Sequence, residues 1–163
     1  MTYRRRLLSA MLATIWTFAC AGSTSTSGSA APTAEPTQGT VTRTDAGCTL
    51  TGVAGPVKAG YITLTAVNKT SAAAGFDMGR IAEPNTFQDF ATYIEKDKQS
   101  AAAGQASLGH PAYFTDVFRV QLQPSKTGEL YGSVRQGTYA IACFGQTPSG
   151  MRPTALVGPI QVQ

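Results

Sequence analysis

Apolar and polar residues alternate with a period of two in several stretches between residues 61 and 162. The clearest are residues 61–67 (YITLTAV), where Ile62, Leu64 and Ala66 share one side, and residues 116–123 (DVFRVQLQ), where Phe118, Val120 and Leu122 do. Such alternation, rich in β-branched and aromatic residues, is typical of strands with one buried face. Shorter segments of the same kind are residues 76–81, 130–134, 138–143 and 157–162. Short strands separated by Gly and Pro turns predict an all-β sandwich.

One segment between these strands has a helical period instead. Thr86 is a suitable N-cap, and Asp89 stands three residues later, as in a partial capping box. Four apolar residues then share one helical face: Phe87, Phe90, Ala91 and Ile94. This spacing predicts a helix over residues 87–98, inside an insertion of about residues 83–110.

The N-terminal residues have the pattern of an export signal. Arg4, Arg5 and Arg6 precede an apolar run over residues 7–18, which is too short for a membrane span and suits a signal peptide. The segment Thr17-Phe18-Ala19-Cys20 resembles a bacterial lipobox. The resemblance implies a signal peptide of residues 1–19 and a mature N-terminal Cys20 that carries lipid, palmitate included. The alternative is an ordinary secretory signal that leaves Cys20 as a free thiol.

The signal is followed by a polar stretch and then by one domain. Residues 20–44 are rich in Ser, Thr, Ala and Pro, so we expect a lipidated cysteine followed by a flexible tether. Residues 45–163 have the length of a single domain and contain no second apolar span. This organisation predicts an extracytoplasmic domain that Cys20 anchors to the lipid bilayer of the bacterial cell membrane.

The net charge of +4 arises mainly from the N-terminal signal. Without the three arginines of residues 4–6, the thirteen basic side chains fall to ten, against nine acidic ones. The remaining charges are scattered, and the densest run, residues 95–98 (EKDK), alternates in sign. Such a run is typical of a solvated helix face, and we expect no nucleic-acid binding.

Three strand motifs resemble those of cupredoxins. They are residues 59–68 (AGYITLTAVN), residues 137–143 (GTYAIAC) and residues 158–162 (GPIQV). The resemblance implies a cupredoxin-like Greek-key β-sandwich over most of residues 48–163, with residues 83–110 inserted. Blue-copper members of the family bind copper through two His, one Cys and a weak Met.

The ligand set of a blue-copper site is incomplete in this sequence. Cys143 and Met151 stand at plausible positions, but Gln146 stands where a His is expected between them. Residues 74–78, near the other expected His, contain none. The chain has one histidine, His110, which lies in the insertion before Pro111 and which we expect to be a surface or turn residue.

Cys143 therefore has two interpretations. With Cys20 lipidated, Cys48 and Cys143 remain as an even pair in an oxidising compartment, which favours a disulfide. The same arrangement resembles the metal-free cupredoxin-like domain of EfeO-type iron-uptake lipoproteins, and no cofactor is then expected. Alternatively, Met78, Cys143, Gln146 and Met151 form a soft site for copper in its Cu(I) state, which leaves Cys48 unpaired.

The sequence offers no catalytic motif. It contains neither a Gly-x-Ser-x-Gly nor an HExxH pattern, so no enzyme is expected. The leading hypothesis is a membrane-anchored lipoprotein with a non-catalytic binding or accessory domain, acting on an unidentified protein or small molecule. Tyr93, Tyr113 and Phe114 flank the insertion and are candidate partner contacts, although packing against the sandwich is their alternative role. The other hypotheses are a copper-handling lipoprotein and an accessory component of an iron-uptake system.

Overall fold

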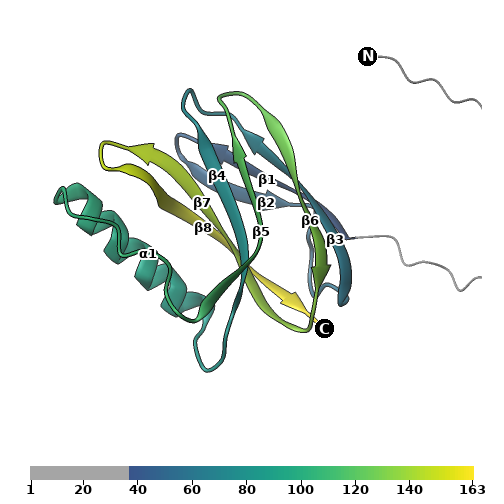
Figure 1. The fold of residues 1–163 in the computed structure, drawn as a ribbon. Helices are drawn as coiled ribbons and strands as arrows, with labels where there is room; N and C mark the ends of the chain where they lie inside the picture. Colours follow the sequence, from purple (N-terminus) through teal and green to yellow (C-terminus); the bar gives the residue numbers. More distant parts are fainter. Residues whose placement is uncertain (1–36) are drawn as a thin grey trace, which may run out of the picture. The chain divides into compact units, whose positions relative to one another are not determined.

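A computed structural model describes residues 37–163, which form two four-stranded sheets packed face to face with one helix outside them (Figure 1). The predicted all-β sandwich with one helical insertion is confirmed. The predicted signal peptide, Cys20 and the first part of the predicted tether lie outside the described residues. No helix among the described residues is long and apolar enough to cross a membrane.

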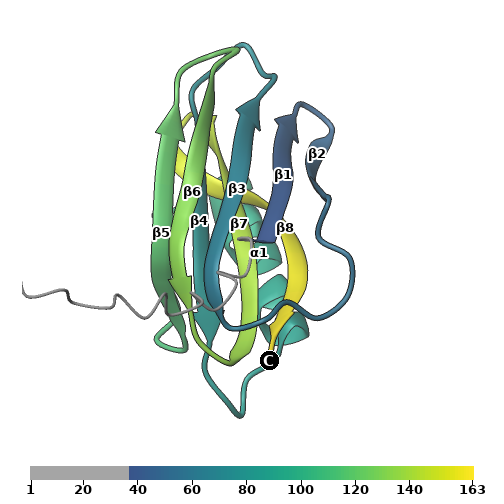
Figure 2. The same cartoon turned by 90° about the vertical axis from the view of Figure 1, so that its right-hand side faces the viewer.

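The first sheet has the strand order β2–β1–β3–β6, visible side by side in Figure 2. These strands are β1 (Thr37–Thr44), β2 (Gly47–Thr51), β3 (Gly60–Asn68) and β6 (Thr127–Val134). β1 pairs with β3 in parallel, and the other pairs are antiparallel. The alternation predicted for residues 61–67 is present, because Ile62, Leu64 and Ala66 are fully buried.

The second sheet has the order β5–β4–β7–β8, with all neighbours antiparallel. Its strands are β4 (Ala74–Ile81), β5 (Phe114–Leu122), β7 (Gly137–Thr147) and β8 (Gly150–Val162). β4 and β7 are central strands, and their inward side chains, such as Phe76, Met78 and Ile141, are fully buried. These side chains meet Ile62, Leu64 and Leu130 of the first sheet in the main core.

The helix α1 (Phe87–Ala102) lies against the outer face of the second sheet, on β7 and β8 (Figure 1). The predicted capping box is confirmed, since Thr86 Oγ1 accepts from the Asp89 amide and the Asp89 carboxylate accepts from the Thr86 amide. Phe90 and Ile94 form a second apolar cluster with residues of the sheet: Ile81, Phe114, Ala140 and Ala142. The insertion is therefore packed onto the sandwich.

The start of the folded domain differs from the prediction. Part of the predicted tether, residues 37–44, is strand β1, and Cys48 lies within the next strand, β2. These segments consist mainly of Thr and Gly, with Val41 as the single fully buried side chain of β1. Polar residues of high β-propensity fit a sheet that faces water on one side, and few apolar residues then mark the strand.

Candidate functional site

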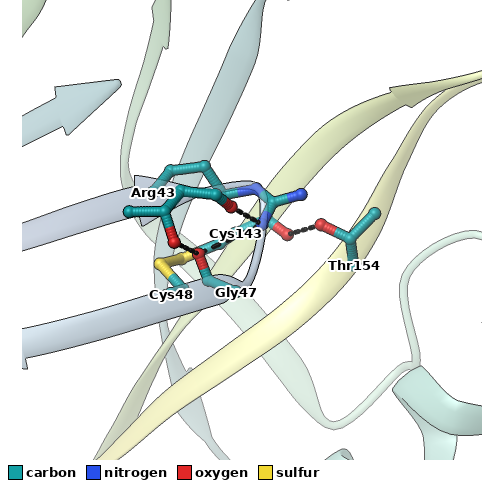
Figure 3. The surroundings of a disulfide bond; sticks show 6 residues. Arg43, Gly47, Cys48, Cys143 and Thr154 are labelled. Carbon is teal, nitrogen blue, oxygen red and sulfur yellow. Dashed lines mark hydrogen bonds between the residues drawn. A yellow bond between two sulfur atoms is a disulfide. The ribbon is translucent and has the colours of Figure 1, made fainter. Parts of the chain in front are cut away.

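Cys48 and Cys143 form a disulfide (Figure 3), as predicted. Cys48 lies on β2 of the first sheet and Cys143 on β7 of the second, with their Cα atoms 6.4 Å apart. The Cys143 carbonyl accepts a hydrogen bond from Thr154 Oγ1 at 3.2 Å, and Arg43 donates to the Gly47 carbonyl at 3.1 Å. The bond therefore joins the two sheets.

The alternative Cu(I) site is not assembled. The sulfur of Cys143 is bonded to Cys48 and cannot act as a thiolate, and Met78 is fully buried in the main core. No open ligand loop follows Cys143, because β7 and β8 continue as a hairpin in which Gln146 pairs with Met151. Met78 and Cys143 thus face the core, whereas Gln146 and Met151 lie in the hairpin, so the four side chains do not converge on one ion.

The three candidate contact residues serve mainly to hold the insertion in place. Phe114 is only 5% exposed and packs on Phe90, with ring centroids 4.2 Å apart. Tyr113 meets the same Phe90 ring edge-on, and the Tyr93 hydroxyl donates to the Leu108 carbonyl at 2.7 Å. Phe114 is thus unavailable to a partner, and the two tyrosines are partly occupied by intramolecular packing.

The charge run over residues 95–98 is not wholly solvated, contrary to the prediction. Asp97 is 0% exposed and lies 3.7 Å from Arg152 of β8, which is 2% exposed. Asp97 Oδ1 also accepts from Ser107 Oγ at 3.0 Å and from the Leu108 amide at 2.6 Å, while Arg152 donates to the Gln105 carbonyl. The ion pair therefore fixes the segment that follows α1 to the helix and to β8.

This fixed segment carries His110 to the outer face of the second sheet, where it meets Asp77, Asp116 and Arg119. Asp77 on β4 is paired directly with Arg119 on β5. A β-bulge then shifts the register so that Asp116 lies opposite Gly79 and Val117 has no partner. The bulge turns Asp116 to the same face as Arg119, which strict alternation would not do.

Arg119 links the other three side chains of this cluster. Its Nε donates to Asp77 Oδ1 at 2.9 Å, and its Nη2 lies 2.8 Å from Asp77 Oδ2 and 2.6 Å from Asp116 Oδ2. The same Nη2 lies 3.4 Å from His110 Nε2. The other imidazole nitrogen, Nδ1, is 3.5 Å from Asp116 Oδ1. Two carboxylates, an imidazole and a guanidinium thus share one small volume.

Burial raises the pKa of Asp77, and the hydrogen bonds and charge of Arg119 oppose that shift. Asp77 in turn raises the pKa of Arg119, chiefly by accepting the hydrogen bond of its side chain. Asp77 is therefore a buried acid that depends on a cation to hold its negative charge. Groups of this kind in clefts are candidates for functional sites.

The cluster borders a cleft of about 240 Å³ on the outer face of the second sheet. Its polar walls are Asp77, His110, Arg119 and Gln121, and its apolar walls include Phe144 and Met151. The His110 ring stacks near Phe144 and near Phe114, with centroid distances of 6.2 and 6.1 Å. A few convergent polar groups beside apolar walls are typical of a small-ligand site.

Sequence reasoning missed this cluster. His110 was expected to be a surface or turn residue, and it is 41% exposed by its side chain, but it also faces two carboxylates. The four residues come from β4, the segment after α1, and both ends of a bulge in β5, so no short motif unites them. The available signal was the single histidine of the chain, close in sequence to Asp116 and Arg119.

Several solved structures are similar to the chain, and two of them illustrate the likeness. Dithionite-reduced auracyanin from the photosynthetic bacterium Roseiflexus castenholzii is 14% identical, with a TM-score of 0.43 over 78% of this chain and 97% of its own. Azurin (Az-iso2) from the obligate methylotroph Methylomonas sp. strain J is 10% identical, with a TM-score of 0.41 over 77% and 97%. Both are cupredoxins, and the likeness concerns the fold alone. No protein-family model matches the sequence, and no curated protein is similar to it.

Proposed function

We propose that the protein is an extracytoplasmic lipoprotein whose sandwich is a non-catalytic binding module, anchored to the membrane through Cys20. The observation that carries this proposal is the disulfide between Cys48 and Cys143. A disulfide across two sheets fits an oxidising compartment outside the cytoplasm. It also removes the one cysteine that stands where a cupredoxin has its copper thiolate.

The donors present do not suit a blue-copper centre. Such a centre needs two imidazoles and a thiolate, whereas this sequence has one histidine and a bonded sulfur at Cys143. His110 and Asp77 lie instead at a cleft on the outer face of the second sheet. We therefore assign ligand binding to this cleft and derive no electron transfer through copper.

The test is the intact mass of protein extracted from bacterial membranes with detergent, measured with and without reductant. We expect a chain that begins at Cys20 and carries lipid mass, with no free thiol before reduction. Reduction should add one hydrogen to each of the two sulfurs. A Cys20→Ala variant is the matched control and should appear in the soluble fraction. An unlipidated membrane-free wild type, or two free thiols in it, would overturn the proposal.

A further inference from the structure

One nitrogen of Arg119 occupies the point at which three potential metal ligands converge. Its Nη2 lies 2.8 Å from Asp77 Oδ2, 2.6 Å from Asp116 Oδ2 and 3.4 Å from His110 Nε2. One ligand atom from each of Asp77, His110 and Asp116 lies within 4.8 Å of the others. The positive nitrogen is therefore surrounded much as a metal ion would be.

We propose that Asp77, His110 and Asp116 form a binding site for a divalent transition-metal ion, which Arg119 fills in the metal-free protein and vacates when the ion binds. The inference rests on the proposed function, because it names the ligand class of the cleft beside these residues. It concerns a place and a ligand set different from those of a blue-copper centre.

The exposure of the four side chains fits such an exchange. The Arg119 side chain is 58% exposed and can turn into solvent, whereas the Asp77 carboxylate is buried on the central strand β4 and stays in place. With Arg119 inside, the two carboxylates and one guanidinium leave the cluster one negative charge when His110 is neutral. A divalent ion in place of the guanidinium balances the two carboxylates, and the freed Arg119 gains hydration.

The ligand types decide which ions suit the site. Two carboxylate oxygens and one imidazole nitrogen match Zn²⁺ and similar first-row ions, which bind readily to His and Asp together. Ca²⁺ and Mg²⁺ prefer sites in which every ligand atom is an oxygen and in which the number of ligands is larger. Three protein ligands leave further coordination positions, which water or a small ligand in the adjoining cleft, lined also by Gln121 and Met151, would complete.

The test is a titration of the full chain, purified in detergent without a histidine tag, with Zn²⁺ as the probe and Mg²⁺ as the comparison ion. We expect one Zn²⁺ per chain near neutral pH and no binding of Mg²⁺ at the same concentrations. His110→Ala and Asp116→Asn should each weaken Zn²⁺ binding by about tenfold or more. Arg119→Gln should tighten it, because the competing cation is gone.

Glu129→Gln, an exposed carboxylate of β6 on the other sheet, is the matched control and should leave the affinity unchanged. Circular dichroism and a free-thiol assay establish that each variant is folded with its disulfide intact. Absence of Zn²⁺ binding, or binding that survives both His110→Ala and Asp116→Asn, would overturn the metal site. An unchanged or weaker affinity in Arg119→Gln would overturn the displacement step. The lipid and thiol measurements are independent of this titration, so either hypothesis can fail alone.

Discussion

Arg152 and Asp97 form a buried charged pair that holds the insertion on the sandwich. Among the described residues they are more deeply buried than the other charged side chains, at 2% and 0% exposure. Their hydrogen bonds reach the carbonyls and amides of residues 105–108, which lead to His110. Within residues 37–163, Asp97 Oδ2 and Arg152 Nε have no hydrogen-bond partner, so few other groups could compensate for the loss of either residue.

Removing only one charge of the Asp97–Arg152 pair should therefore lower the free energy of unfolding more than removing both charges. We expect Arg152→Met to lower the free energy of unfolding by about 3–5 kcal/mol, because it leaves the Asp97 carboxylate buried without its cation. The double variant Asp97→Asn with Arg152→Met should recover part of that loss. Urea unfolding followed by circular dichroism measures both, with Lys96→Met, an exposed neighbour on α1, as the control. Equal losses in the single and double variants would show that the charge pair itself is not the cause.

For individual residues, the sequence predicted the cysteine pair but not the cluster of polar side chains around Arg119. Cysteines in an oxidising compartment pair by number, so Cys48 and Cys143 could be matched without a structure. Asp116 could not be placed, because strict alternation assigns it to the core face with Phe118, and only the bulge at Val117 reverses this. Asp97 was misjudged for a related reason, since a polar residue on a buried helix face is recognised only with its partner, Arg152.

Among the elements, α1 depends on its first turn as well as on its apolar face. The Asp89 carboxylate accepts from both the hydroxyl and the amide of Thr86, at 2.8 Å each. These two hydrogen bonds, the side-chain one first, lower the pKa of Asp89. Because the folded-state pKa is depressed, the stabilisation is present above the ordinary pKa of an aspartate and is lost as the pH falls through the folded value.

We therefore expect Asp89→Ala to lower the melting temperature at pH 7, and we expect this effect to shrink as the pH is lowered towards about 2, because the wild-type carboxylate takes up its proton as the pH falls through the folded-state pKa. Thr86→Ala should cost about 1 kcal/mol at pH 7, as is usual for an N-cap residue. Thermal unfolding of the two variants and the wild type at both pH values measures these differences. Gln88→Ala, exposed in the same turn, is the control. An Asp89→Ala effect that persists unchanged at pH 2 would contradict the capping explanation.

Strands and the helix were predicted correctly where apolar residues follow the period of the element, and were missed or cut short where polar residues occupy the buried positions. β3 and β5 were found because Ile62, Leu64, Val120 and Leu122 mark one face. β1 and β2 were missed because threonines line them. The helix was ended at residue 98, four residues early, since its buried stripe continues beyond Ile94 through Asp97 and Ser100, which are polar.

For the whole molecule, the disulfide covalently links two sheets that otherwise meet mainly through the apolar side chains of the core. It joins residues 95 positions apart in the sequence, from the edge strand β2 to the central strand β7. In the chain-entropy model a loop of this length stabilises the folded state by about 4–5 kcal/mol, because it restricts the unfolded chain. That is a large share of the total stability of a single domain.

The stabilising effect of the disulfide bond can be separated from that of the cysteine side chains by comparing oxidised and reduced wild-type protein, since both contain Cys48 and Cys143. We expect the reduced wild type to unfold at a markedly lower urea concentration than the oxidised wild type, by about 4–5 kcal/mol in free energy of unfolding. A Cys48→Ala variant, which has no disulfide under either condition, should match the reduced wild type and respond little to reductant. Because Cys48 is only half-buried while Cys143 is fully buried, substituting Cys48 disturbs the core least. If reduction left the free energy of unfolding unchanged, the chain-entropy explanation would be wrong, and packing between the sheets alone would hold the sandwich together.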